Sequence, residues 1–178
     1  MSNKTTWTID TAHSEIHFKV KHMMVSTVTG AFNKFEGSLV TESDDFDGAS
    51  ISFSADVNSI NTNNEARDGH LKSDDFFNAA DFPAITFQST GFSKKSDDQY
   101  VLTGNLTIRD VTRELTLAVT YNGTILDPYG NTKAGFEIGG KVSRKEFGLK
   151  WNAVTEAGGV VVGDEIQLSL NVQLAKAN

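Results

Sequence analysis

The chain of 178 residues is long enough for one domain with a substantial core, and nothing in its composition divides it, so we expect a single domain spanning residues 1–178. A hydrophobic fraction of 38% with 12 Phe excludes a disordered chain, because burying that much apolar surface can offset the entropy lost on folding. Its 16 Lys and Arg against 23 Asp and Glu leave a net charge of -7, which disfavours nucleic acid as a partner.

The first ten residues, MSNKTTWTID, lack the apolar segment of a secretory signal. No later segment approaches the roughly 18 consecutive apolar residues of a membrane-spanning helix. We therefore expect a cytoplasmic protein without stable insertion into a membrane. The absence of cysteine excludes disulfides, a thiolate nucleophile and a zinc-thiolate site.

The dominant pattern along the chain is an alternation of apolar and polar residues, which is typical of strands with one buried face. In the segment EIHFKVKHM, for example, Ile16, Phe18 and Val20 alternate with charged or polar neighbours. The same alternation predicts about eight strands, at 15–23, 29–40, 50–57, 85–87, 100–108, 115–121, 134–142 and 166–174.

Short turns such as DPYGN and KKSDDQ join these strands, which indicates an antiparallel sheet. Such a sheet must close on itself or pair with a second one. Many of the predicted strands last nine or more residues, which is long for a small sandwich. The expected fold class is therefore all-β, with an antiparallel barrel of about eight strands.

One segment, residues 62–83, departs from the alternation and predicts a short helix followed by a loop. Thr62 to Glu65 reads as a capping box that starts a helix reaching about Lys72. The loop then carries Phe76, Phe77 and Phe82, which must find apolar contacts outside the strand ladder.

Candidate chemistry is sparse. Asp10, His13 and Ser14 are the residue types of a nucleophilic triad, but a turn before the first long strand is the simpler interpretation. The four histidines make a poor metal set, because His17 and His22 have opposite parity on one strand and should point to opposite sides of the sheet. We expect no metal site, no cofactor and no catalytic residue.

Arg67, Asp68 and His70 follow each other closely on the predicted helix. They could bind a polar head group at the mouth of an apolar pocket or move a proton. They could equally form a solvated helix surface. Their pattern leaves both interpretations open.

Several long segments resemble one known family. They are WTIDTAHSEIHFKVKHMMVSTVTGAFNKFEG, RDGHLKSDDFFNAADFPAITFQS, LTGNLTIRDVTRELTL, SRKEFGLKWN and VVGDEIQLSLNVQL, in that order along nearly the whole chain. Together they resemble the YceI-like family of polyisoprenoid-binding proteins.

The resemblance implies a lipocalin-like barrel whose apolar tunnel holds a long-chain isoprenoid lipid, such as a prenyl quinone or polyprenyl compound. It implies binding, transport or storage without catalysis, and a role in stress responses. It also allows a homodimer, since dimers are common among relatives. Two alternatives stay open: an enzyme acting on a hydrophobic substrate with His70 or His13 as acid or base, and a structural barrel with a packed core.

If the tunnel exists, strand parity and the position of the 62–83 segment predict which residues contact the ligand. Arg67, Asp68 and His70 are the candidates for the head group or mouth, and the phenylalanines after them are expected to form a cap. The predicted ligand contacts are Phe18, Val20, Phe32, Phe53, Val57, Phe76, Phe77, Phe82, Phe87, Leu102, Leu106, Leu117, Phe136, Ile138, Phe147 and Leu168.

Overall fold

The computed structural model describes residues 4–23, 25–43, 45–149 and 162–177. Within them, strands form one antiparallel sheet that is accompanied by helix α1 (Glu65–Lys72). The strands are β1 (Thr5–Ile9), β2 (Glu15–His22), β3 (Ser26–Phe32), β4 (Phe35–Thr41), β5 (Ser50–Asp56), β6 (Ile60–Asn61), β7 (Ala84–Lys94), β8 (Gln99–Ile108), β9 (Val111–Leu126), β10 (Thr132–Ser143) and β11 (Val162–Lys176). Three 3-10 turns complete the described elements: η1 (Thr11–His13), η2 (Val57–Ser59) and η3 (Arg144–Phe147).

The sheet closes into a barrel. Its strands follow the order β1-β4-β5-β7-β8-β9-β10-β11, and β11 returns to pair with β1. Strand β11 is long enough to pair with two strands. Leu174 lies opposite Ile9 of β1 near one end, and Leu168 lies opposite Phe18 of β2 farther along. Since β2, β3 and β6 continue β1, β4 and β5 along the barrel, the eight predicted strands and the all-β barrel fold are confirmed.

Three neighbouring strands bend at the same level of the barrel. The side chain of Asp10 caps η1 by accepting from the Ala12 amide, and Asp56 caps η2 in the same way at Asn58. Between them, the Asp56 amide donates to the Lys34 carbonyl at 2.9 Å. These bonds give partners to the amides of Ala12, Asn58 and Asp56 where the strands change direction.

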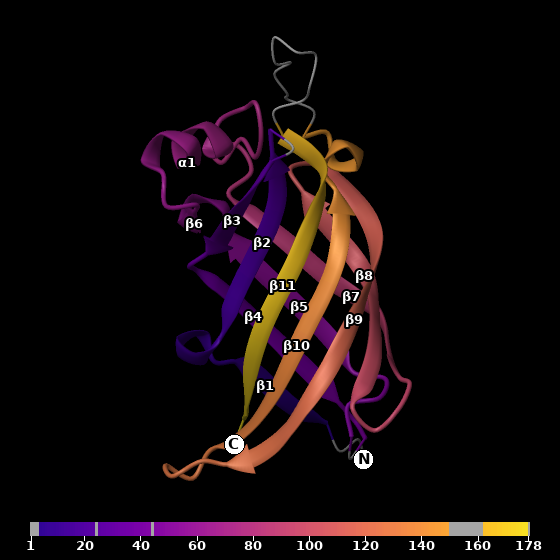
Figure 1. Ribbon diagram of the computed structural model, residues 1–178. Coiled ribbons are helices and arrows are strands. Elements are labelled where there is room, and N and C mark those ends of the chain that lie inside the picture. The colour runs from indigo at the N-terminus through magenta and orange to yellow at the C-terminus, as the bar shows by residue number, and fades with distance from the viewer. Residues whose placement is uncertain (1–3, 24, 44, 150–161, 178) are drawn as a thin grey trace.

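Helix α1 lies outside the barrel wall at its upper left in Figure 1, at the end opposite the two chain termini. The helix ends at Lys72 as predicted, but it begins at Glu65, two residues later than a Thr62 cap implies, and its cap is Asn64, whose side chain accepts from the Arg67 amide at 2.9 Å. The predicted Thr62 cap is wrong, because the Thr62 hydroxyl and amide both donate to the Asp68 carboxylate instead.

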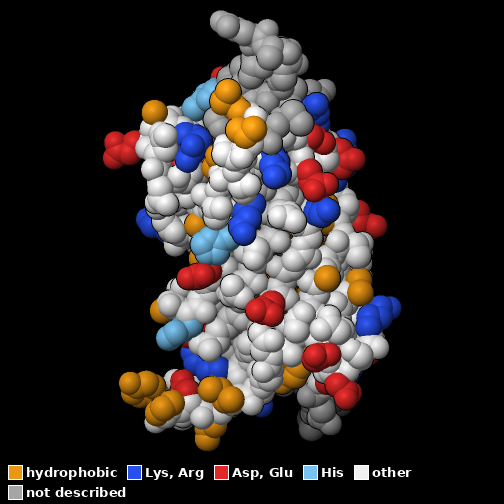
Figure 2. Space-filling view, viewed as in Figure 1, with side chains coloured by type: hydrophobic (Ala, Val, Ile, Leu, Met, Phe, Trp, Pro, Cys, Tyr) orange, Lys and Arg blue, Asp and Glu red, His pale blue; other side chains and the backbone are white. Residues whose placement is uncertain are grey.

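The outer surface carries charges of both signs, and its exposed large hydrophobic residues gather in two hairpins (Figure 2). Met23 and Val25 lie between β2 and β3, whereas Ile125 and Leu126 end β9 and Tyr129 lies in the turn from β9 to β10. No described helix is both long enough and apolar enough to cross a bilayer.

Candidate functional site: an apolar cavity inside the barrel

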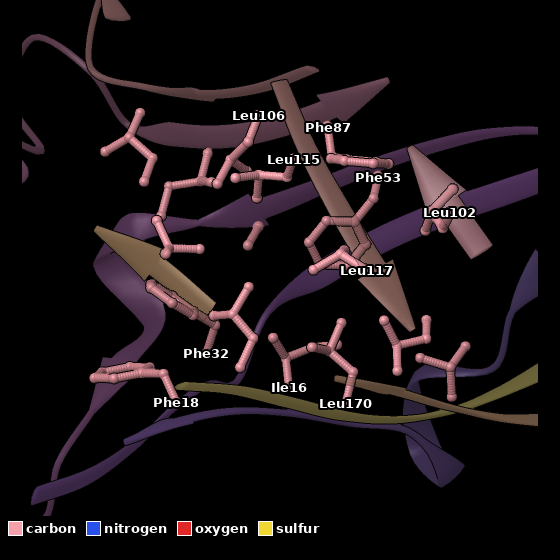
Figure 3. A pocket seen from close by; sticks show the side chains of 18 of the residues that line it. Ile16, Phe18, Phe32, Phe53, Phe87, Leu102, Leu106, Leu115, Leu117 and Leu170 are labelled. Atoms are coloured by element: carbon pink, nitrogen blue, oxygen red, sulfur yellow. The ribbon is translucent and has the colours of Figure 1, made fainter. Parts of the chain in front are cut away.

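The interior of the barrel holds an elongated cavity. The space open to the centre of a water molecule amounts to about 250 Å³. Figure 3 shows side chains from β2, β3 and β11 facing side chains from β5, β7, β8 and β9 across this space. Among the described lining residues, all but Gly37, Ser38, Ser52 and Arg144 have apolar side chains. A space of this composition suits an apolar molecule.

The buried apolar residues of the barrel form two packed clusters, one toward each end. The lower cluster includes Trp7, Phe46 and Tyr100, and the upper one includes Ile16, Val57 and Phe147. The residues between the clusters remain only partly buried and pack against both: Phe35, Phe53, Leu106, Leu168 and Val172.

An aromatic cluster closes the lower end. Phe46 comes from the loop after β4, and its ring lies 5.3 Å from Trp7, 5.5 Å from Tyr121 and 5.1 Å from Phe136. Phe92 stacks on Tyr100 beside them at 4.7 Å. Aromatic rings with centroids this close pack against one another. The sequence pattern did not indicate Phe46, because it lies outside any alternating segment.

The segment after α1 covers the opposite end. Leu71, Phe76 and Phe77 line the cavity, and the Phe77 ring packs edge-on against Phe32 at 6.1 Å. Phe76 is almost fully buried at 6% exposure. We call residues 73–82 the cap segment, because this loop brings its apolar side chains onto the cavity from outside the strand ladder.

Arg109 holds the cap segment to the barrel. It lies in the tight turn between β8 and β9 with a φ of 57°, a left-handed conformation uncommon for residues other than glycine. Its guanidinium donates to the carbonyl oxygens of Asp74 and Phe76 at 3.1 and 3.2 Å, pairs with the Asp74 carboxylate, and lies 5.9 Å from the Phe82 ring centroid. These contacts attach the cap segment to the turn between β8 and β9, which lies far from it in sequence.

Most of the predicted ligand contacts line the cavity. They are Phe18, Val20, Phe32, Phe53, Phe76, Phe77, Phe87, Leu102, Leu106, Leu117, Phe136, Ile138 and Leu168. Their inward orientation follows from the alternation of side chains along each strand.

Three predicted contacts, Val57, Phe82 and Phe147, lie elsewhere. Val57 and Phe147 fall in the 3-10 turns η2 and η3, where strand parity no longer applies, and both are buried in the upper cluster at 1% and 0% exposure. Phe82 is partly buried with its ring against the Arg109 guanidinium, and it does not line the cavity. They therefore leave the set of candidate ligand contacts.

Arg67, Asp68 and His70 do not line the cavity. Arg67 donates to the hydroxyl and carbonyl oxygens of Thr62 at 2.8 and 2.7 Å, and Asp68 accepts from the same residue. His70 contacts the Asp75 carboxylate at 2.8 Å. These bonds tie the helix to the segments before and after it, which is a structural role.

Arg144 is the one charged residue among the described residues that line the cavity. It is 3% exposed, and its guanidinium donates to the carbonyl oxygens of Leu149, Val162 and Gly163 at 2.7 to 3.0 Å. Burial lowers the pKa of Arg144, and the charge of Asp164 opposes that shift. Sequence reasoning did not single this residue out, although the segment SRKEFG that contains it was among those resembling the family.

The residues that suggested catalysis are not arranged for it. His13 Nδ1 lies 2.8 Å from Asp10, but the Ser14 hydroxyl bonds to the backbone of Gln173 rather than to His13. Lys133 also donates to Asp10 at 2.6 Å, and this bond is the largest cause of a lowered pKa at that carboxyl.

The metal prediction concerned the histidines. His17 bonds to Glu15 on its own strand, whereas the side chain of His22 lies outside the described residues. Across the described ranges, no three His, Asp or Glu residues gather as a metal site would require.

Comparison with known proteins gives consistent matches over nearly the whole chain. A UPF0312 protein of Staphylococcus aureus (strain N315) is 36% identical over 172 residues, which cover 96% of this chain and 98% of the relative. The crystal structure of a Campylobacter jejuni YCEI protein is 28% identical, with a TM-score of 0.76 over 89% of this chain and 90% of that one.

A third match has the same fold at low sequence identity. It is the structure of a polyisoprenoid binding domain from Saccharophagus degradans implicated in plant cell wall breakdown, with 14% identity and a TM-score of 0.70 over 99% of this chain and 100% of that one. The family profile described as a YceI-like domain matches residues 7–174. This coverage, together with the barrel described above, shows that the chain belongs to the YceI-like family.

Proposed function

We propose that this protein binds one long-chain isoprenoid lipid, such as a prenyl quinone or polyprenyl compound, inside its barrel, and carries or stores it without transforming it. The observation that carries the proposal is the elongated cavity with its almost wholly apolar lining. The structurally similar protein from Saccharophagus degradans is a polyisoprenoid binding domain, which supports the choice of ligand class.

Burial of the chain would supply the affinity. Each CH₂ group removed from water contributes roughly 0.8 kcal/mol, so a tail of about twenty carbons offers a gross ~16 kcal/mol before the costs of ordering and association reduce it. Apolar walls attract any chain of suitable length and width. We therefore infer that the shape of the tail, more than the identity of its head group, determines which lipids bind.

The composition of the lining favours binding over catalysis. General acid–base chemistry needs a titratable group within hydrogen-bond reach of the reacting atoms. The charged lining residue described above, Arg144, stays protonated at any physiological pH and already donates to backbone carbonyl oxygens. His13 and His70, the histidines considered for an enzyme, lie outside the lining.

Extraction of the natively purified protein tests the proposal. We expect mass spectrometry of the solvent extract to find an isoprenoid lipid at about one molecule per chain. Leu168→Trp should abolish the recovery of lipid, because Leu168 packs against both apolar clusters and an indole there would block the middle of the cavity. Gln167→Trp is the matched control, since Gln167 is exposed on the outer face of β11.

Two results would contradict the proposal. One is a wild-type protein that yields no lipid and, after delipidation, takes none up from vesicles containing a prenyl quinone. The other is turnover of the bound lipid into a new product, which would favour the enzyme instead.

A further inference from the structure

Four strands place a glycine at an inward-facing position of the barrel. Each glycine stands opposite a residue that lines the cavity, so its missing side chain would also have pointed inward. The pairs are Gly30 with Phe18, Gly37 with Phe53, Gly104 with Leu115 and Gly140 with Leu168.

Large side chains occupy the space that three of these glycines leave empty. A methyl group at Gly30 would lie 2.2 Å from Cζ of the Phe18 ring, and one at Gly104 would lie 2.4 Å from Cζ of Phe87. At Gly140 the nearest atom would be Cδ2 of Leu117, at 2.3 Å. Real contacts are never this short, so each covering side chain lies directly against the glycine backbone.

The arrangement sets the width of the cavity. Phe18, Phe87 and Leu117 all line the cavity, and they can lie flat along the wall only because no side chain stands beneath them. A side chain at any of these glycines would turn the covering group into the lumen. The wall therefore leaves an open lumen, whereas most protein interiors are closely packed.

The resulting width can be worked out from the cavity's volume and length. Its lining runs along β11 from Val162 to Leu174, which is ~40 Å of strand and ~30 Å along the axis of a barrel with ordinary strand tilt. Spread over that length, 250 Å³ for the centre of a water molecule corresponds to a free radius of about 3.0 Å once the radius of water, about 1.4 Å, is added.

A free radius of this size matches one kind of ligand. A carbon atom has a contact radius of about 1.9 Å, and a methyl branch adds a bond of about 1.5 Å. A branched chain is therefore about 5.3 Å across, from the back of its main chain to the outer edge of the methyl group, and it fits within a free diameter of about 6 Å. Two parallel chains or a fused-ring system do not.

We propose that Gly30, Gly104 and Gly140, with the side chains that cover them, limit the cavity to one aliphatic chain with branches no larger than methyl. Two-chain phospholipids and sterols are excluded by the same width. The inference rests on the proposed lipid binding and adds the residues that select the ligand's cross-section.

Gly140→Ala is the sharpest test, because only Leu117 opposes the new methyl group and that side chain can swing into the lumen. Gly139→Ala is the matched control: it lies on the adjacent, opposite-facing position, and its methyl would meet nothing closer than the Leu168 carbonyl oxygen at 3.8 Å. Gly104 is less suitable, because a methyl there would also lie 2.6 Å from the Gln88 carbonyl oxygen and strain the backbone.

The ligands for the test are isotope-labelled geranylgeraniol and the unbranched alcohol of the same main-chain length, offered to delipidated protein. We expect Gly140→Ala to weaken geranylgeraniol binding roughly tenfold or more and the unbranched alcohol distinctly less. Gly30→Ala should act in the same way through Phe18, and Gly139→Ala should leave both dissociation constants unchanged. The double variant Gly140→Ala/Leu117→Ala should regain geranylgeraniol binding, since it removes the displaced side chain.

The outcomes separate the two proposals. Equal losses for both alcohols, or no loss, in Gly140→Ala would overturn the width limit while leaving lipid binding intact. Wild-type binding of cholesterol or dioleoyl phosphatidylcholine as tight as that of geranylgeraniol would do the same. A wild-type protein that binds no alcohol, phospholipid or sterol would overturn both. Failure of the double variant to regain binding, with its melting temperature near that of Gly139→Ala, would also count against the width limit.

Discussion

Removal of the Phe77 ring tests whether the cap segment touches the bound lipid. Phe77 is half-buried, packs against Phe32 on one side and faces the cavity on the other. Full burial of such a side chain is worth about 1.5–3 kcal/mol, so the half that faces the ligand contributes about 1 kcal/mol to holding it. Phe77→Ala should therefore speed lipid release roughly fivefold to tenfold.

Phe82→Ala is the matched control, because Phe82 belongs to the same segment but does not line the cavity. The lipid dissociation rate is measured by transfer to acceptor vesicles, and thermal unfolding is recorded with and without lipid. Phe82→Ala should lower the melting temperature of both forms and leave the release rate unchanged. An unchanged release rate in Phe77→Ala, with equal destabilisation of the two forms, would show that the ring is ordinary core.

Three further predictions follow from the same structure. Leu117→Lys buries an unpaired charge, so urea titrations should show a loss of several kcal/mol in unfolding free energy. Thr116→Lys, on the outer face, should cost little, and equal unfolding midpoints for the two variants would mean that the strand register is wrong. The bond from Lys133 lowers the pKa of Asp10 below its ordinary value of 3.8, so the Asp10 carboxylate stabilises the fold above pH 3.8, and this stabilisation is lost as the pH falls below 3.8. Asp10→Asn should therefore be less stable than wild type at pH 7, and urea titrations should show this difference shrinking below about pH 4. Asn64→Ala should cost about 1 kcal/mol and speed amide exchange in α1, since it removes the helix cap.

The alternation of apolar and polar residues determined most of the fold. Side chains alternate across a strand with a period of two whatever the rest of the chain does, so Phe18 and Leu117 could be placed on the inner face from their neighbours alone. The same logic fails where a strand ends. Val57 and Phe147 sit in 3-10 turns just beyond their strands, and a pattern read from the sequence cannot locate such a boundary to within one residue.

Whether the barrel is hollow was decided only in three dimensions. A sequence of alternating Phe, Leu and Gly is equally compatible with a packed core, because the outcome depends on which residues meet across strands. Gly140 makes room only because Leu117, on the neighbouring strand, lies over it, and Gly30 does so only beneath Phe18. Those encounters follow from the register of the closed barrel, which joins Ile9 to Leu174 at opposite ends of the chain.

For polar side chains, too, the sequence determined their identity and the tertiary structure determined their role. The sequence identifies Arg67, Asp68 and His70 as residues that could bind a polar group or transfer a proton. In the structure they bond to Thr62 and Asp75, and these bonds fix helix α1 in place. Arg144 carried no local signal, yet the fold buries its charge in the cavity wall. The identity of a side chain is local information, whereas its burial and its hydrogen-bond partners arise from contacts between distant segments, and only the tertiary structure specifies them.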